Sequence, residues 1–496
     1  MLKFGTLNEN YEAILIPLDQ TMETPKTKEM SVNHSLEKIL SSITDWKEFK
    51  GKLGELLIIY PFQILPNIKR VILVGIGKKS DLSLEKIRRA FGKAGNTIRK
   101  HKLSEIGIII PNKLSKYSEG MFEGLFLGNY KFQKYKTVKN YITPNLASII
   151  SISDNNIQNM IESAYHHSDA IIQGTYLARD LGNSPSNIIT PTYLAEEAKK
   201  LSELGIKINI LNLEGIKKEE MNLFLAVAKG SLDTEPPVFI IMDYIPEKSY
   251  NETLVLVGKG ITFDTGGITL KPGEGMGAMI FDMCGAGAVI GTMKTIGLLR
   301  PKIRIIGLIP ATPNVPDANS YRPGDIIQAR SGKQVEIIST DAEGRNILAD
   351  TLDFAKKYKP NLVLDLATLT GGAVIALGHL YAALYANEKA QKFQEKILQA
   401  AINSGESCWP MPLDEDYLEY LKSDHADLKH SGGRWGSSIT AAKFLEQFTD
   451  YPWIHIDIAG TAWKGGTMGG KTNWYNATNG ATGYGVRLIT ELIRLW

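Results

Sequence analysis

The sequence predicts a mixed α/β fold in two domains, with a smaller domain first and a larger one with a mostly parallel central sheet after it. The first observation is length, because 496 residues exceed one ordinary domain. The second is composition, since 43% hydrophobic and 22% charged residues are typical of a globular protein with a sizeable core. The third is the alternation of short strand patterns with helical patterns, which indicates helices layered on sheets.

The first third of the chain predicts a small α/β sandwich. A helix is expected over Leu84–Lys100, where apolar residues recur at helical spacing, and Asp81 and Ser83 are the two candidates for its N-cap. Five short apolar runs around it predict strands: EAILIPL, ELLIIY, RVILVGIG, IGIII and ASIISIS.

A long helix is expected near residues 156–181, and we place the domain junction in it, which gives domains over 1–160 and 161–496. Thr190 and Pro191 then start another helix as a capping pair. Strand–helix alternation resumes and predicts the larger domain with its mostly parallel sheet. Its strands are expected at IKINIL, PPVFIIMDY, TLVLVG, RIIGLIP, QVEIIS, NLVLDLA and WIHIDIAG.

Charge, cysteine content and hydropathy exclude several classes of function. The net charge of +3 is close to balance, so no nucleic-acid or anionic-membrane partner is expected. Cys284 and Cys408 are too few for a zinc–thiolate cluster or a disulfide scaffold, which favours a reducing compartment. The N-terminus lacks a leader-like apolar core, and no run reaches the roughly eighteen unbroken apolar residues of a membrane span, so we expect a cytoplasmic protein.

Acidic residues gather where strands are expected to end. Asp264, Asp341 and Glu343 each follow a predicted strand with glycine close by, and ligand sites in open α/β sheets form at the carboxyl ends of strands. Asp341 and Glu343 are two residues apart, so an extended segment would direct both to the same side. Asp282 lies in the apolar helical run MIFDMCGAGAVIGTM, where an acid requires a partner.

Four converging acids predict a cation site, because each close like-charged pair costs on the order of a few kcal/mol in a partly buried site. Two divalent ions would balance four carboxylates, and an oxygen-rich ligand set fits Zn, Mn, Mg or Co. Such a pair of ions lowers the pKa of a shared water to about 7 and clamps a carbonyl oxygen, which is hydrolase chemistry.

Simpler interpretations stay open on spacing alone. Asp264 by itself is better explained as a cap or turn residue. Asp341 and Glu343 are also explained as acids stabilised by the dipole of a following helix. The scattered histidines are expected to be structural. Three basic residues are most simply solvated or ion-paired surface groups: Lys259, Lys271 and Arg345.

Five motifs in the second domain resemble the leucyl (cytosol) aminopeptidase family, a group of two-metal aminopeptidases. They are VGKGITFDTGGITLKP, FDMCGAGAV, STDAEGRNILAD, DLATLTGG and HIDIAGTAW. The resemblance is strong over Leu177–Gly460 and weaker at both ends. The TDAEGR hexapeptide, with the lysine–aspartate spacing upstream of it, is highly specific.

The resemblance implies a role for each residue of the cluster. Two divalent ions per subunit, Mn or Zn before Mg or Co, would be held by Lys259, Asp264, Asp282, Asp341 and Glu343. Lys271 would stay charged and stabilise the oxyanion of the tetrahedral intermediate. Arg345 would hold a bicarbonate ion that serves as general base. A lysine that binds a metal is neutral, so the pKa of Lys259 would have to fall far below about 10.4.

The resemblance further implies a substrate pocket lined by Met279, Thr368, Gly371 and Ala481, for which ordinary core packing is the simpler alternative. An apolar pocket of that kind favours Leu- or Met-like N-terminal residues, although each methylene discriminates by only about 1–3 kcal/mol. The family fold has a macro-like N-terminal domain, and the family implies peptide substrates and a homohexamer.

The sequence departs from the family pattern at four places: Ser339, Ile280, Gly287 and Tyr484–Gly485. None is an implied ligand, so rate and specificity are affected more than the chemistry. Two alternatives to a general aminopeptidase are a narrower dipeptidase and a catalytically silent hexameric scaffold or DNA-binding protein that retains the fold. Loss of a ligand would favour the silent scaffold, and all five implied ligands are present.

Overall fold

The computed structural model describes residues 3–21, 36, 39–40, 48–61, 64–138, 145–150, 155–248, 250–464, 474–476 and 479–496. It divides into two compact units. Unit 1 contains Met1–Ile172 and Thr472–Ala477, and unit 2 contains Gln173–Lys471 and Thr478–Trp496. The division falls inside the long helix α4 (Asn155–Asn183). The boundary expected after residue 160 lies in the same helix and stays a prediction.

Unit 1 contains a five-stranded sheet in the order β2-β3-β1-β4-β5, which is parallel except for the pairing of β2 with β3. Its strands are β1 (Ala13–Asp19), β2 (Leu56–Ile59), β3 (Val71–Gly77), β4 (Glu105–Ile109) and β5 (Asn145–Ile150). Helix α2 (Leu84–His101) packs closely on α3 (Ser118–Asn129), because a side chain at Gly124 would meet the carbonyl oxygen of Arg88. Ser83 is the N-cap of α2, since its hydroxyl accepts a hydrogen bond from the Lys86 amide.

Unit 2 contains a nine-stranded sheet in the order β15-β14-β17-β13-β8-β10-β7-β6, with β9 also paired to β10. The central strands β17, β13, β8 and β10 are parallel to one another, so the expected fold class is confirmed. The strands are β6 (Lys207–Leu211), β7 (Val238–Tyr244), β8 (Thr253–Gly258), β9 (Gly260–Asp264), β10 (Arg304–Asn314), β13 (Leu362–Ala367), β14 (Ala382–Ala386), β15 (Cys408–Pro410) and β17 (Trp453–Asp457).

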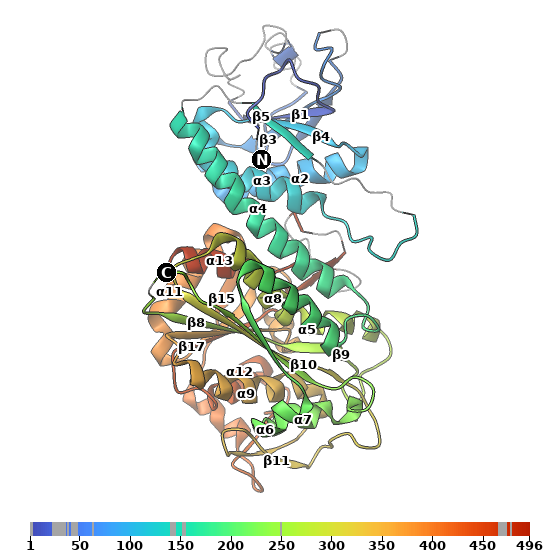
Figure 1. Ribbon diagram of the computed structural model, residues 1–496, viewed down its shortest axis with the longest axis vertical. Coiled ribbons are helices and arrows are strands. Elements are labelled where there is room, and N and C mark those ends of the chain that lie inside the picture. The colour runs from blue at the N-terminus through green and yellow to red at the C-terminus, as the bar shows by residue number, and fades with distance from the viewer. Residues whose placement is uncertain are drawn as a thin grey trace. The chain divides into compact units, whose positions relative to one another are not determined.

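Helices cover both faces of this sheet and close a separate apolar core on each (Figure 1). One face carries α5 (Pro191–Lys199), α8 (Cys284–Leu299), α11 (Gln391–Ser404) and α13 (Val486–Arg494). The other carries α6 (Leu213–Lys218), α7 (Asn222–Ala228), α9 (Glu343–Ala355) and α12 (Ser437–Glu446). Thr190 caps α5 and Pro191 is its first residue, as the sequence predicts.

One helical run among the described residues, Met276–Leu299, is long and apolar enough to cross a membrane. It consists of the 3₁₀ segment η5 (Met276–Met283) and α8. Its most apolar window is 72% buried inside the protein, which is typical of a core helix.

The strand expected at QVEIIS lies outside the central sheet. Only Gln334–Glu336 is extended, as β12, and it belongs to a three-stranded sheet with β11 (Ile326–Gln328) and β16 (Leu428–Lys429). The expectation that Asp341 and Glu343 lie on an extended segment is also wrong. Asp341 lies in a 3₁₀ turn, η6 (Thr340–Ala342), and Glu343 begins α9, because the Ser339 hydroxyl accepts the Asp341 amide and turns the chain into a helix.

The remaining elements are short. Helix α10 (Gly371–Leu377) follows β13, and β18 (Trp463–Lys464) pairs antiparallel with β19 (Gly480–Ala481).

Candidate functional site

Lys259 lies between β8 and β9 and is 3% exposed, so the interpretation of it as a solvated surface lysine is wrong. Its Nζ lies 2.9 Å from Asp282 Oδ2 and 2.9 Å from Glu343 Oε1, and it donates to the Thr368 carbonyl at 2.8 Å. Burial lowers the pKa of Lys259, but the nearby carboxylates outweigh that effect and raise it. Gly344 makes room for the lysine, since a side chain there would collide with its methylenes.

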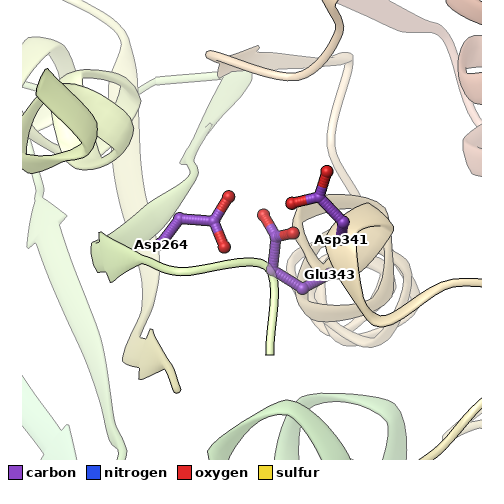
Figure 2. Close-up of side chains that lie close together, drawn as sticks. All are labelled: Asp264, Asp341 and Glu343. Atoms are coloured by element: carbon purple, nitrogen blue, oxygen red, sulfur yellow. The ribbon is translucent and has the colours of Figure 1, made fainter. Parts of the chain in front are cut away.

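Three carboxylates face one another at the floor of the site (Figure 2). Asp264 ends β9, and one oxygen from each of Asp264, Asp341 and Glu343 lies within 4.8 Å of the other two. Asp264 Oδ1 accepts hydrogen bonds from the Gly266 amide and from Asn314 Nδ2, both at 2.8 Å. Burial, with repulsion from Glu343, raises the pKa of Asp264 to about 7. A cap residue needs only a main-chain amide beside it, so capping does not explain why three carboxylates lie together here.

Lys271 forms ion pairs with two of these carboxylates. Its Nζ lies 2.8 Å from Asp264 Oδ2 and 2.5 Å from Asp341 Oδ1, and its side chain is 22% exposed. A tight turn brings it there, because Gly266 adopts a φ of +86° and the Lys271 amide donates to the Thr265 carbonyl. Lys271 is therefore fixed in the site, and its description as a solvated lysine is also wrong.

Asp282 is buried in η5, two residues before α8 begins. Its Oδ1 accepts from the Thr368 hydroxyl at 2.7 Å, and its Oδ2 lies against Lys259. Burial raises the pKa of Asp282, and Lys259 opposes that rise. The partner that the sequence requires for this acid is thus a lysine and a threonine.

A cavity of about 190 Å³ contains most of the expected site residues. Nine of them line it: Lys259, Asp264, Lys271, Met279, Asp282, Asp341, Glu343, Thr368 and Gly371. Five further lining residues were not predicted: Phe281, Leu369, Thr370, Val374 and Ala459. The motifs DLATLTGG, HIDIAGTAW and FDMCGAGAV contain four of these five, all but Val374, so the motifs were a usable signal for those four.

Two expected residues do not line this cavity. Arg345 is buried in α9 and donates through Nη1 to the His430 carbonyl at 2.9 Å. Burial lowers the pKa of Arg345 to about 10, and its Nε has no hydrogen-bond partner within the described part of the chain. Ala481 is buried in β19, where its amide donates to Asn183 Oδ1. Its place in a substrate pocket stays a prediction.

The charges of the site do not balance. Asp264, Asp282, Asp341 and Glu343 supply four carboxylates, whereas Lys259 and Lys271 supply two ammonium groups. Glu343 Oε2 is buried and has no hydrogen-bond partner among the described residues. A buried carboxylate oxygen without a donor is costly, so a surplus of this kind fits a cation-binding site.

Comparison with known proteins gives consistent matches over nearly the whole chain. The catalytic-domain model of the cytosol aminopeptidase family matches residues 176–490, and the family's N-terminal-domain model matches residues 16–139. A probable cytosol aminopeptidase of Geobacter sp. (strain M21) is 39% identical over 459 residues, which is 92% of this chain and 91% of the relative. Another, of Alkaliphilus oremlandii (strain OhILAs), is 39% identical over 491 residues, which is 97% of this chain and 96% of the relative.

Two solved structures are also similar. A mutant of tomato leucine aminopeptidase aligns with a TM-score of 0.85 and 30% identity, over 99% of this chain and 95% of that one. The bottromycin maturation enzyme BotP in complex with Mn aligns with a TM-score of 0.83 and 28% identity, over 98% of this chain and 99% of that one.

Proposed function

The chain belongs to the cytosol aminopeptidase family and is a metallo-exopeptidase, and on this premise we propose that it releases N-terminal residues from peptides with two divalent cations. The proposed ions are Mn or Zn, and Mg or Co also suit the oxygen-rich donor set. The proposed ligands are Lys259, Asp264, Asp282, Asp341 and Glu343.

The observation that carries the proposal is the surplus of carboxylates in one cavity. One oxygen from each of three of the four acids lies within 4.8 Å of the other two, and Glu343 Oε2 has no hydrogen-bond donor in the described part of the chain. A divalent pair polarises a carbonyl oxygen and makes water a stronger nucleophile near neutral pH. The donor set fits such a pair, since the acids alone repel one another.

Lys259 is proposed to act as a ligand in its neutral form. Its Nζ already lies 2.9 Å from oxygens of Asp282 and Glu343, which are two other proposed ligands. The Thr368 carbonyl accepts a hydrogen bond from this Nζ and so orients the nitrogen. A bound dication would favour loss of one of the three ammonium protons, which would free the lone pair of the nitrogen for the metal.

Lys271 is proposed to keep its charge and to stabilise the oxyanion that forms when the peptide carbonyl is attacked. Among the six charged residues that line the cavity, it combines a positive charge with partial exposure to the cavity. A fixed ammonium is effective there because it requires no reorganisation during the reaction. Arg345 is proposed to hold a bicarbonate ion, and its buried Nε, which has no hydrogen-bond partner among the residues that the structure describes, supports an anion nearby.

The proposed preference is for Leu- or Met-like N-terminal residues. Met279, Phe281 and Val374 give the cavity an apolar wall beside its charged floor. Peptides with a free α-amine are the proposed substrates, and we further propose a cytoplasmic homohexamer, in line with the names of the relatives and the family resemblance.

Metal removal tests this function. The protein is treated with a chelator, reloaded with Mn or Zn, and assayed for hydrolysis of leucine amide beside Asp282→Ala. Activity should follow the metal in the wild type and disappear in the variant. N-terminal acetylation of a peptide substrate should also abolish turnover. The proposal is wrong if metal-loaded wild-type protein turns over no unblocked peptide.

A further inference from the structure

The carboxylate of Asp457 hydrogen-bonds to uncharged residues that line the cavity, and among the described residues it makes no such bond to the charged ones. Asp457 ends β17 and is 1% exposed. Its Oδ1 accepts the amides of Leu369 and Ala459, both at 3.1 Å, and its Oδ2 accepts the Thr370 hydroxyl at 2.6 Å. Two of these three donors belong to residues on the neighbouring chain segment that lines the cavity.

The two strands explain why the carboxylate is needed. β13 and β17 are parallel, with Ala367 opposite Asp457, and the last main-chain bond between them runs from the Ile458 amide to the Ala367 carbonyl at 2.8 Å. Among the described residues the two segments form no main-chain bond beyond that point, so the Leu369 amide has no strand partner there. The Asp457 carboxylate takes the place of the missing strand and satisfies the buried donor.

The segment held in this way is the wall of the proposed substrate site. Four consecutive residues of it line the cavity: Thr368, Leu369, Thr370 and Gly371. The Thr370 hydroxyl donates to Asp457 and accepts the Ala373 amide at 3.1 Å, so it also fixes the start of α10, from which Val374 lines the cavity. One carboxylate thus fixes both the segment after β13 and the helix that follows.

We infer that Asp457 is a positioning residue that sets the shape of the substrate side-chain pocket through Leu369 and Thr370. The inference rests on the proposed function, because it concerns that site. A shift of about 1 Å in groups that position a substrate reduces rates by on the order of 10²-fold. Loss of the carboxylate should therefore weaken substrate binding and side-chain discrimination, while the proposed metal ligands, none of which hydrogen-bonds to the Asp457 side chain within the described part of the chain, keep their metal.

The test compares matched substitutions inside and outside the site. Asp457→Asn removes the negative charge and the oxygen that accepts the Thr370 hydroxyl, Thr370→Val removes the hydroxyl itself, and Thr370→Ser retains the bond. Asp350→Asn is the control for Asp457, because Asp350 is equally buried and accepts the main-chain amides of Phe224 and Arg330 away from the cavity.

Thr490→Val is the control for the threonine. Thr490 is buried in α13, and its hydroxyl donates to the Val486 carbonyl. The measurements are kcat and KM for leucine amide and alanine amide, the affinity of the Mn-loaded protein for L-leucine and L-alanine, and the affinity for Mn.

We expect Asp457→Asn to raise KM for leucine amide about 10-fold and to narrow the leucine-to-alanine preference in both turnover and binding, since hydrogen bonds to a charged acceptor are stronger than those to a neutral one. Thr370→Val should change the same quantities less, and Thr370→Ser should restore them. Affinity for Mn should stay within about 3-fold of wild type in every variant.

The inference is overturned if Asp457→Asn and Thr370→Val change KM and preference no more than their controls do. Equal loss of stability in Asp457→Asn and Asp350→Asn, with unchanged discrimination, would likewise reduce Asp457 to a structural role. The binding measurements separate this result from failure of the proposed reaction. A wild type that binds L-leucine without turnover contradicts the reaction, whereas the loss of discrimination in the variants is still measured.

Discussion

Two clusters of charged side chains, one in each unit, differ in balance. In unit 1, Arg88 Nε lies 2.8 Å from Glu123 and its Nη1 lies 2.7 Å from Glu85, while Arg89 lies 2.8 Å from Glu85. This α2–α3 ion cluster contains two acids and two bases on regular helices. Each charge has an opposite charge beside it, which is what a buried structural ion pair requires.

The cavity in unit 2 differs in both respects: its acids outnumber its bases, and its charged residues do not lie in the middle of regular helices. Its four carboxylates face two lysines, and the residues come from turns and element ends rather than from the middle of helices. Burial alone does not distinguish the clusters, because Arg88 is as buried as Lys259. The comparison teaches that a surplus of one charge, held on loops at the carboxyl ends of strands, indicates a site, whereas balanced charges on helix faces indicate packing.

The largest expected effect is on Glu343→Gln in unit 2. Glu343 Oε2 has no hydrogen-bond partner among the described residues, and the substitution neutralises this carboxylate. Loss of a residue that only hydrogen-bonds to a metal ligand reduces activity roughly 10- to 100-fold, so loss of a ligand itself should reduce metal-dependent hydrolysis of leucine amide by more than that. The measurement is kcat/KM together with affinity for Mn. Glu406→Gln is the control, because Glu406 is buried in the same unit but paired with Arg487. Unchanged Mn affinity in Glu343→Gln would contradict the comparison.

The matching change in unit 1 should affect stability instead. Glu123→Ala takes one of two acidic partners from the buried Arg88, and leaving a buried charge unpaired costs about 3–5 kcal/mol. Because Glu85 still lies beside Arg88, the free energy of unfolding, measured in urea, should fall by an amount at the lower end of this range, while kcat/KM of the folded protein stays within about 2-fold. The double variant Arg88→Met with Glu123→Leu should recover most of the loss, and failure to recover would show that the pair does more than pack α2 on α3.

Lys271→Met is expected to act on catalysis alone. Removing one group that stabilises the oxyanion reduces kcat by about 10²–10³-fold, or about 2.7–4 kcal/mol. Because Lys271 contacts Asp264 and Asp341, its loss also leaves their charges less compensated, so Mn should bind at least as tightly as in the wild type. A fall in Mn affinity that parallels the fall in kcat would assign Lys271 to metal binding instead.

Sequence patterns foresaw local features of this chain better than distant ones. The caps at Ser83 and Thr190 and the apolar strands follow from neighbouring residues, and the structure contains them. The displacement of β12 to a separate sheet depends on its pairing with β16, about 90 residues later, which no local pattern reveals. The bonds of Asp457 to Leu369 and Thr370 depend on the pairing of β13 with β17 in the same way.

The site shows the same division. Asp282 was expected to need a partner, because an acid in an apolar run is costly. The identity of that partner was not foreseeable from spacing, since Lys259 is 23 positions away and reads as a surface residue. The family motifs supplied what periodicity lacked, as nine of the eleven site residues that the resemblance implies line one cavity.

The smallest expected effect is on the pH dependence of stability, and it concerns a carboxylate of unit 1. Glu12 in unit 1 accepts the Ser104 amide at 2.6 Å and the Ser104 hydroxyl at 2.9 Å, and these bonds lower the pKa of Glu12 to about 2. A lowered pKa in the folded state means that Glu12 adds stability above its unfolded value near 4.5, and that this stability disappears as the pH falls towards 2. In contrast, burial, together with repulsion from Glu343, raises the pKa of Asp264 in unit 2.

Glu12→Gln should therefore flatten the loss of stability between about pH 4.5 and pH 2, by at most about 1 kcal/mol because the side chain is partly exposed. Urea unfolding at pH 7 and pH 3 measures it, with Ser104→Ala as the intermediate case, since that variant keeps the amide donor and removes only the hydroxyl. An equal loss at both pH values would mean that Glu12 contributes packing rather than charge. In that case, the ionisation of Glu12 would not contribute to stability, and the contrast with the raised pKa of Asp264 would not extend to stability.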